Sequence, residues 1–328
     1  MIRTVMALAL AVTGLAACTD SGPATTAKPE ASATPPPSPA ASDPTPACDA
    51  AADFDARASF RPTNGTQITA GSHMQTIKDR GRLILGTNQG NVLFSSRDPF
   101  TGKIEGFDVD MGREIARAIF GDPDRLEIRV VANADRMDRV ADGTVDLVIS
   151  TMTTNCARWQ KVDFSTVYYE SGQRVLVGKD SPVQRIEDLG GRPVCAVSGS
   201  TSLDNLAKVN PAPVRVTRSD YGSCLVAFQL GEAEAVSTDD TILAGLAAQD
   251  PYAKVVGPRF TEEPYAIAIA HDHREFTRYV NAVLDRMRAD GTWAKVYDRW
   301  LGASGPAPQP PAARYLPCTP PGPEPRCR

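Results

Sequence analysis

Residues 145–165 read VDLVISTMTTNCARWQKVDFS. The apolar run at the start is typical of a buried strand, and the hydroxyl side chains of residues 150–154 come where that strand ends. Arg158 follows about one helical turn later. In α/β proteins ligands gather at the carboxyl ends of strands, and a planar guanidinium makes two parallel hydrogen bonds to a carboxylate. The stretch therefore predicts an α/β layer whose edge binds a carboxylate; the alternative is a solvated arginine behind a threonine N-cap.

Short β-branched runs alternate with helical segments between about residues 75 and 302, as expected for α/β layers around a mainly parallel sheet. The expected strands are 82–87, 126–131, 145–150, 175–178, 194–197, 214–217, 235–237, 254–256 and 266–270. Met111, Ile115 and Ile119 repeat at four-residue spacing, so we expect a helix there that Asp108 caps and Gly121 ends.

A second strand end has the same polar character as the first. Residues 198–202, SGSTS, follow the expected strand 194–197 and supply a glycine that permits close backbone approach together with hydroxyl donors, Thr201 and Ser202 among them. An ordinary helix N-cap would have the same sequence. The loop lacks the lysine of a P-loop, so phosphate binding is not expected.

The third strand end, STDDT at residues 237–241, carries two carboxylates. We expect Asp240 to cap the helix 241–248 and Asp239 to face the ligand, where its carboxylate could take an ammonium group. The three strand ends together offer a cation, neutral donors and an anion. That set is the complement of an α-amino acid zwitterion.

Charge and cysteine use narrow the class of protein. The chain has 328 residues and a formal net charge of −4, which argues against a nucleic-acid or anionic-membrane partner attracted by bulk charge. Besides Cys18 there are six cysteines, an even number that suits an oxidising compartment. A metal site is the alternative, but the chain has three histidines and lacks a CxxC pair, so we expect neither metal nor cofactor.

Sequence alone does not fix the disulfide pairing. We expect Cys318 to pair with Cys327, because the two close a short loop, and Cys195 to pair with Cys224, because both lie in one predicted βαβ region. That choice leaves Cys48 to join the N-terminal extension to Cys156.

The N-terminus predicts export. Arg3 precedes an apolar run over residues 5–17 that is too short to span a bilayer, and the run closes with LAAC at residues 15–18. This ending resembles the bacterial lipobox, which implies a signal peptide over 1–17 and a lipidated Cys18 that anchors the protein to the outer face of the cell membrane. The alternative is a plain secretion signal with an incidental cysteine.

Two segments flank the expected folded body. Residues 18–74 begin with the lipidated cysteine and a tether rich in Pro, Ala, Ser and Thr, followed by an N-terminal extension. Residues 303–328 form a Pro-rich tail. Neither composition favours a hydrophobic core.

Several motifs occur in a fixed order: GFDVD at 106–110, VDLVI at 145–149, Arg158 with VDFS at 162–165, GST at 199–201, AVSTDD at 235–240, EPY at 263–265 and DGT at 290–292. In these motifs residues 78–302 resemble the extracytoplasmic amino-acid-binding proteins of ABC importers, solute-binding protein family 3. With its lipobox and Pro-rich tether, the chain is similar to the glutamate/glutamine-type binding lipoproteins of actinobacteria.

The resemblance implies an α/β, two-lobed periplasmic-binding-protein fold, the type II or Venus flytrap form. Lobe I would comprise 75–170 and 263–302, and lobe II 171–262. Two crossing strands, near 169–174 and near 261–265, would join them. Closure of the lobes on a ligand follows, because only the closed state satisfies both ligand charges.

The resemblance also implies roles for individual residues. Arg158 would make bidentate contacts with the ligand α-carboxylate, helped by Thr153 and Thr201, while Asp239 would take the α-ammonium group. Further residues expected to line the site are Ser150, Thr151 and Ser202.

The ligand side chain is constrained by a departure from the family pattern. Many relatives carry an aromatic residue in the first strand–helix loop, where this chain has QGNVLFS at 89–95. The change suits a short polar side chain met by Asn91, hence an Asp, Glu, Asn or Gln ligand. An acidic side chain would need a cation, for which Arg97, Lys161 and Arg174 are the candidates.

The expected function is a monomeric binding protein, not an enzyme, that hands its amino acid to an ABC permease and ATPase. One alternative is a receptor that reports to a membrane sensor protein. Another is a dehydratase-like enzyme, since some dehydratases resemble this two-lobed body. General acid–base chemistry needs a positioned proton donor or acceptor, and the expected cleft motifs contain no histidine.

Overall fold

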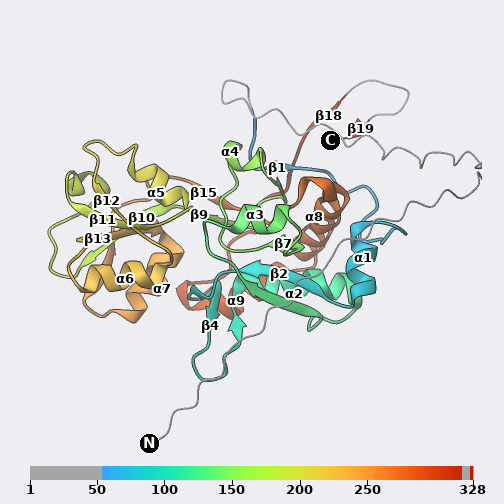
Figure 1. Cartoon of the computed structure of the whole chain (residues 1–328), viewed down its shortest axis with the longest axis horizontal. Helices are drawn as coiled ribbons and strands as arrows, with labels where there is room; N and C mark the ends of the chain where they lie inside the picture. The colour runs from blue at the N-terminus through green and yellow to red at the C-terminus, as the bar shows by residue number, and fades with distance from the viewer. Residues whose placement is uncertain (1–53, 320–325, 328) are drawn as a thin grey trace, which may run out of the picture. The chain divides into compact units, whose positions relative to one another are not determined.

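The structure is a computed structural model that describes residues 54–319 and 326–327. Its centre is a pair of five-stranded sheets (Figure 1). The first sheet has the order β6-β2-β7-β16-β8. Its strands are β2 (Leu83–Thr87), β6 (Leu126–Val130), β7 (Leu147–Val148), β8 (Asp163–Phe164) and β16 (Ala268–Ile269). We call this sheet and the helices packed on it the first lobe.

The second sheet, the centre of the second lobe, has the order β12-β11-β13-β10-β14. Its strands are β10 (Gln173–Gly178), β11 (Pro193–Val197), β12 (Val214–Arg218), β13 (Ala235–Asp239) and β14 (Ala253–Val256). Each of the strands expected from the sequence overlaps a strand of one of these two sheets.

The expectation of mainly parallel sheets is wrong. In the first sheet β2 is parallel to β6 and β7, but β16 is antiparallel to β7 and β8. In the second, β11 is parallel to β12 and β13, but β10 is antiparallel to β13 and β14. The reason is connectivity, because β10 and β16 follow directly on the strands that cross between the lobes.

Those crossing strands are β9 (Tyr169–Ser171) and β15 (Glu263–Tyr265), which pair antiparallel. They lie where the sequence places the two crossovers. The chain therefore passes from the first lobe to the second at β9 and returns at β15.

The helices of the first lobe are α1 (His73–Arg80), α2 (Phe107–Phe120), α3 (Arg136–Ala141), α4 (Cys156–Trp159), α8 (Arg274–Ala289) and α9 (Thr292–Leu301). Those of the second are α5 (Thr201–Leu206), α6 (Tyr221–Gln229) and α7 (Asp240–Gln249). Short 3-10 turns lie at η1 (Ile186–Leu189), η2 (His271–His273) and η3 (Gly302–Ser304). The stripe Met111, Ile115 and Ile119 on α2 is buried in the core of the first lobe, as predicted.

Asp108 does not cap α2. The helix begins at Phe107, two residues earlier than a cap at Asp108 would place it. Its N-cap is Gly106, whose φ of 147° and close approach to Phe94 exclude a side chain. Asp108 is fully buried and accepts hydrogen bonds from the Thr151 N–H (2.8 Å) and the Tyr168 hydroxyl (2.7 Å). Burial raises the pKa of Asp108 to about 7. A local capping signal here is overridden by tertiary partners.

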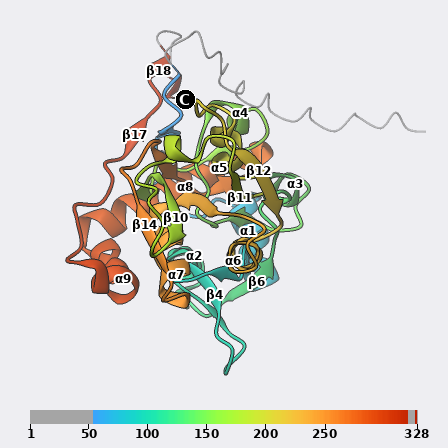
Figure 2. The same ribbon diagram turned by 90° about the vertical axis from the view of Figure 1, so that its left-hand side faces the viewer.

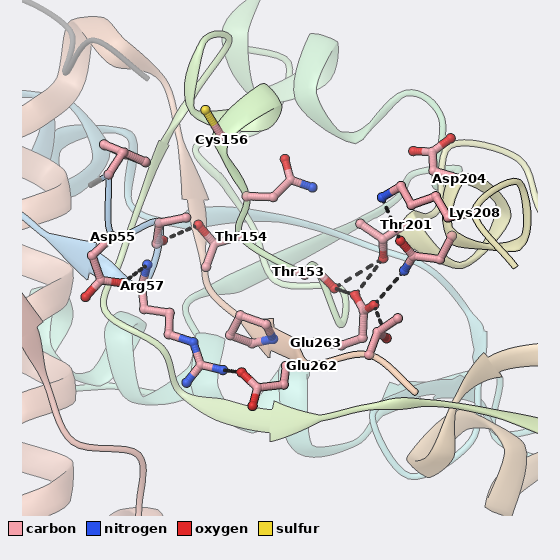
Figure 3. A pocket seen from close by; sticks show the side chains of 16 residues that line it. Asp55, Arg57, Thr153, Thr154, Cys156, Thr201, Asp204, Lys208, Glu262 and Glu263 are labelled. Carbon is pink, nitrogen blue, oxygen red and sulfur yellow. Dashed lines mark hydrogen bonds and ion pairs between the residues drawn. The ribbon is translucent and has the colours of Figure 1, made fainter. Parts of the chain in front are cut away.

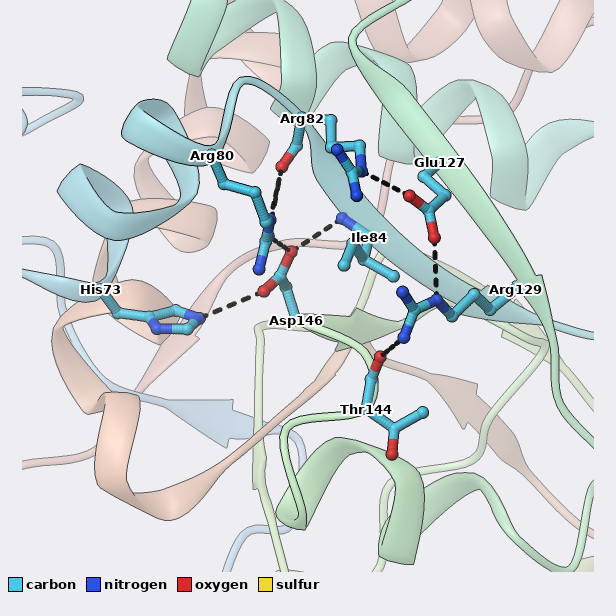
Figure 4. A network of polar contacts seen from close by, with 8 residues as sticks. All are labelled: His73, Arg80, Arg82, Ile84, Glu127, Arg129, Thr144 and Asp146. Atoms are coloured by element: carbon cyan, nitrogen blue, oxygen red, sulfur yellow. Dashed lines mark hydrogen bonds and ion pairs between the residues drawn. The ribbon is translucent and has the colours of Figure 1, made fainter.

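Asp146, just before β7, ties α1 to the first sheet (Figure 4). Its carboxylate accepts from the Ile84 N–H at 2.7 Å and from the Arg80 guanidinium, and lies 3.5 Å from His73 Nε2. Burial acts to raise the pKa of Asp146, but the hydrogen bonds with His73, Ile84 and Arg80 outweigh it and leave the pKa below its ordinary value.

The folded region extends beyond residues 75–302 on both sides. Strand β1 (Ala58–Ser59) pairs parallel with β17 (Arg314–Tyr315) of the tail. Trp159, next to Arg158, donates its indole N–H to the Ala56 carbonyl at 3.1 Å. The N-terminal extension and the tail thus pack together against the first lobe.

Strand β3 (Gly90–Asn91) pairs with β4 (Ser95–Arg97), and the hairpin of β4 and β5 (Ile104–Glu105) projects from the first lobe (Figure 2). Phe100 in its tip is 95% exposed. In the described part of the chain, no helix is both long and apolar enough to cross a membrane.

The predicted disulfide between Cys195 in β11 and Cys224 in α6 is confirmed. Cys156 is also disulfide-bonded, but its expected partner Cys48 lies outside the described residues. Cys318 in β18 (Cys318–Thr319) stands opposite Cys327 in β19 (Arg326–Cys327), and their bond stays a prediction.

Replacing both Cys195 and Cys224 with serine should lower the free energy of unfolding by roughly 3–4 kcal/mol, because the bond closes a loop of 29 residues in the unfolded chain. Urea denaturation of the double variant measures the loss. Ligand affinity should stay within about threefold of wild type, since the bond lies in the core of the second lobe. An unchanged denaturation midpoint would contradict the prediction.

Candidate functional site

Arg158 lies in α4, where Asn155 caps the helix by accepting from the Arg158 N–H at 3.0 Å. Its side chain is buried, and its Nη1 donates to the Thr153 carbonyl at 2.6 Å while Nη2 donates to the Gly199 carbonyl at 3.1 Å. The guanidinium thus lies between a loop of the first lobe and a loop of the second. Burial lowers the pKa of Arg158 to about 10, so the group remains a cation at neutral pH.

Gly199 permits this approach. Its φ is +72°, and a side chain there would lie 2.5 Å from the Cα atom of Ala134 in the first lobe. The glycine expected to bring backbone close to a ligand therefore also brings the second lobe against the first.

Asp239 is the last residue of β13, and only 4% of its surface is exposed. One carboxylate oxygen, Oδ2, accepts from the Tyr265 hydroxyl at 2.6 Å, while Oδ1 has no hydrogen-bond partner within the described chain. Burial, followed by the negative charge of Glu263, raises the pKa of Asp239 to about 8. A buried oxygen without a partner is costly, and an ammonium group would satisfy it.

Asp240 does not cap α7 as expected. The helix begins at Asp240 itself, and Asp239 takes the N-cap position without a side-chain capping bond. The Asp240 carboxylate instead accepts from the Ser171 hydroxyl at 2.7 Å and from Arg259 at 2.6 Å. Asp239 is left free of the helix end, as its expected role requires.

The other residues expected to line the site are buried. Asn91 Nδ2 donates to the Thr151 hydroxyl at 3.2 Å, and Asn91 Oδ1 has no partner in the described chain. Thr151 has φ of +43°, a left-handed conformation that the bond from its N–H to Asp108 helps to hold. The Ser150 hydroxyl accepts from Asn88 at 3.2 Å. The Ser202 hydroxyl turns to Thr238, also at 3.2 Å.

Thr153 and Thr201 are brought together, but their hydroxyls face a residue to which the sequence assigned no role. Both donate to Glu263 Oε2, at 2.6 Å and 2.7 Å. A hydroxyl has one proton to donate, so neither Oγ1 is available as a donor to a ligand carboxylate in this arrangement. Any help that these threonines give to Arg158 comes through their backbone groups.

Arg136, at the start of α3, is the buried cation that sequence reasoning missed. It donates to three backbone carbonyls, those of Asn133 (3.0 Å), Ser150 (2.8 Å) and Gly199 (3.3 Å). Desolvation lowers the pKa of Arg136, and the nearby charge of Asp239 opposes that shift. The available signal was position, because Arg136 follows the end of β6 as Arg158 follows the end of β7.

The three cations that the sequence analysis suggested for an acidic ligand side chain have other surroundings. Arg97 donates to Gln89 and Gly102 within the exposed hairpin. Arg174 donates to the Gly257 carbonyl at 2.7 Å, and Lys161 is exposed. Within residues 54–319, Arg136 and Arg158 have no carboxylate within 4.0 Å.

Both guanidinium groups therefore bring positive charge to the contact between the lobes with only neutral carbonyl partners. The Asp239 carboxyl lies close enough to interact with both charges, and an ammonium group would hold it ionised. Such a set can bind a small zwitterion with a further acidic or amide group. The described residues contain no group of three or more His, Cys, Asp or Glu that could hold a metal ion.

The fold and this site between the lobes define a two-lobed solute-binding protein. Residues 83–303 match the bacterial extracellular solute-binding proteins, family 3, and the chain belongs to that family. Members are extracellular binding proteins, not enzymes, which excludes the dehydratase alternative.

Two relatives and one solved structure show the likeness. The chain is 34% identical to the ABC transporter glutamine-binding protein GlnH of Bacillus subtilis, over 70% of this chain and 84% of the relative. It is 32% identical to the glutamate-binding protein GluB of Corynebacterium glutamicum, over 68% and 80%. A crystal structure of a mutant of ArgBP from T. maritima superposes with a TM-score of 0.66 at 27% identity, over 70% of this chain and 99% of the other. The chain is accordingly a solute-binding protein of an ABC amino-acid importer.

Proposed function

We propose that this protein captures glutamate or aspartate in the cleft between its lobes and delivers it to an ABC permease and ATPase. The observation that carries the proposal is the pair of buried guanidinium groups, Arg136 and Arg158, which have only carbonyl partners. An acidic amino acid has two carboxylates and one ammonium group. The site offers two cations and the Asp239 carboxylate as partners, so each charged group of such a ligand meets a group of opposite charge.

Arg158 is assigned to the α-carboxylate and Asp239 to the α-ammonium group. Arg136 is left for the side-chain carboxylate, and Asn91 Oδ1, Ser150 and Thr151 supply polar contacts around it. Glutamine and asparagine are the second candidates, because one relative is named for glutamine binding. A carboxylate satisfies a desolvated guanidinium better than an amide does, which favours the acidic ligands.

Membrane attachment is part of the same proposal. The sequence ending at Cys18 supports a lipid anchor, and the Pro-rich tether over about residues 19–47 would let the binding domain reach a permease in the same membrane. Mass spectrometry of the N-terminal peptide from membranes of expressing cells tests this anchor. An unmodified peptide that begins elsewhere than Cys18 would contradict it.

A thermal-shift screen of the twenty amino acids on the purified full chain tests the ligand. Glutamate and aspartate should raise the melting temperature most, because a ligand at concentration [L] adds RT ln(1 + [L]/Kd) to stability. Glutamine and asparagine should give smaller shifts, and arginine and lysine none. A flat panel would contradict the binding proposal as a whole.

The Arg136→Met variant tests which group meets the side chain. The ratio of glutamate to glutamine affinity should fall by roughly tenfold or more, because only glutamate loses a charge-assisted contact. Taking the ratio within one variant cancels any general loss of folding or closure. Titration calorimetry supplies both constants, and an unchanged ratio would assign the side chain to other groups.

A further inference from the structure

Glu263, the first residue of β15, carries a fully buried carboxylate held by four neutral donors (Figure 3). Oε2 accepts from the hydroxyls of Thr153 (2.6 Å) and Thr201 (2.7 Å). Oε1 accepts from the Thr261 hydroxyl (2.7 Å) and from Asn205 Nδ2 (3.0 Å). No cation lies within 4.0 Å of this carboxylate over residues 54–319, so its direct partners there are these neutral donors, while Arg158 interacts with it through charge at longer range.

The donors come from both lobes. Thr153 belongs to the loop after β7 in the first lobe, where its backbone bridges to Tyr265 of β15. Thr201 and Asn205 lie one turn apart on α5 of the second lobe and present the same helix face. The carboxylate on the returning crossover thus accepts bonds from both lobes, so the full set of bonds needs the two lobes to lie as close as they do here.

The same donors are linked to Arg158. The Thr153 carbonyl accepts from Arg158 Nη1, and the Gly199 carbonyl, two residues before Thr201, accepts from Nη2. Glu263 therefore holds the side chain of Thr153, whose carbonyl orients the guanidinium. It also holds Thr201, which lies two residues after Gly199, the second carbonyl partner of the guanidinium. Losing one donor costs a buried carboxylate more free energy than it would cost a neutral group. We therefore expect the four hydrogen bonds to form and break together.

We propose that Glu263 is a positioning residue that latches the closed lobes and fixes Arg158 for the ligand carboxylate without itself touching the ligand. This inference takes only the identity of the ligand from the proposed function. The latch itself concerns closure, which can be measured without a ligand.

The test variant is Glu263→Gln, which keeps the shape but turns one acceptor oxygen into an NH₂ group that faces two donors. The matched control is the neighbouring Glu262→Gln, whose side chain is 84% exposed and pairs only with Arg57 in the described structure. Dissociation and association rates for glutamate are measured on the full chain by stopped-flow fluorescence. The latch predicts that Glu263→Gln raises the dissociation rate tenfold or more, with the association rate changed less than threefold, because closure follows encounter. Glu262→Gln should match wild type.

Thr201→Val provides a second variant if Glu263→Gln folds poorly. It removes one donor at nearly constant volume, and it should also raise the dissociation rate. In the double variant the two effects should not add, because both remove the same set of bonds. Additive effects, or a dissociation rate within twofold of wild type in either single variant, would overturn the latch.

Closure in the absence of amino acid separates this inference from the proposed function. Spin labels are placed on the exposed positions Arg125 in the first lobe and Arg215 in the second, and their distance distribution is measured. A shorter-distance population present in wild type should shrink in Glu263→Gln and persist in Glu262→Gln. The same distribution in both variants would overturn the latch, whereas a failed ligand screen with a shrunken population would overturn only the proposed ligand.

Discussion

Replacing Arg158 with alanine should raise the dissociation constant for glutamate by roughly 30-fold or more, because removing one partner of a buried charge pair costs about 2–5 kcal/mol. Both lobes orient Arg158, through the carbonyls of Thr153 and Gly199. Its loss would leave the ligand α-carboxylate dehydrated beside neutral acceptors. Titration calorimetry on wild type and variant measures the change.

Two further variants give this prediction its controls. Arg158→Lys keeps a positive charge but loses the planar fork, so it should recover only part of the affinity. Arg97→Ala removes a guanidinium in the exposed hairpin and should leave the dissociation constant unchanged. Wild-type affinity in Arg158→Ala would remove Arg158 from the site, and equal losses in Arg97→Ala would point to bulk charge as the cause.

Much of the fold could be predicted from the sequence because its signals are local. The strands overlap the predicted runs since β-branched residues and turn residues alternate along the chain. Arg158 and Asp239 were predicted as ligand partners by one rule, that ligands meet the carboxyl ends of strands. Arg136 obeys the same rule at the end of β6 and was missed because the neighbouring residues 132–134 lack the hydroxyl cluster that marks the other strand ends.

What escaped prediction depends on contacts between distant residues. The hydroxyls of Thr153 and Thr201 were expected to serve the ligand, but Glu263, at least 62 residues away from either, accepts both. Asp108 has the sequence of an N-cap, yet Tyr168 and Thr151 draw it into the core. The sequence shows which side chains can donate or accept a hydrogen bond, but the tertiary structure determines which partner each one binds.

Asp239→Asn should weaken the stabilisation by glutamate and yet leave the ligand-free protein more stable than wild type at pH 8.5. The pKa of Asp239 is raised to about 8 by burial, whereas an unfolded aspartate titrates near about 3.9. A carboxyl whose folded pKa is raised binds its proton more tightly in the folded state, so its contribution to stability falls as pH rises from about 4 to about 8. Asparagine does not titrate, so the variant does not lose stability in this way as the pH rises.

The two proteins should therefore have similar ligand-free stability at pH 4.5 and diverge as the pH rises, with the variant ahead; urea denaturation at both pH values measures this. Asp108, whose pKa is also raised, is present in both proteins and cancels from the comparison.

Glutamate binding to wild type at pH 7 should release roughly one proton, because the ammonium group holds Asp239 ionised, and calorimetry in buffers of different ionisation enthalpy detects it. The variant should release none and bind at least about 30-fold more weakly. A variant less stable than wild type at pH 8.5 would mean that Asp239 is already paired in the ligand-free protein, and its role as the ammonium partner would have to be withdrawn.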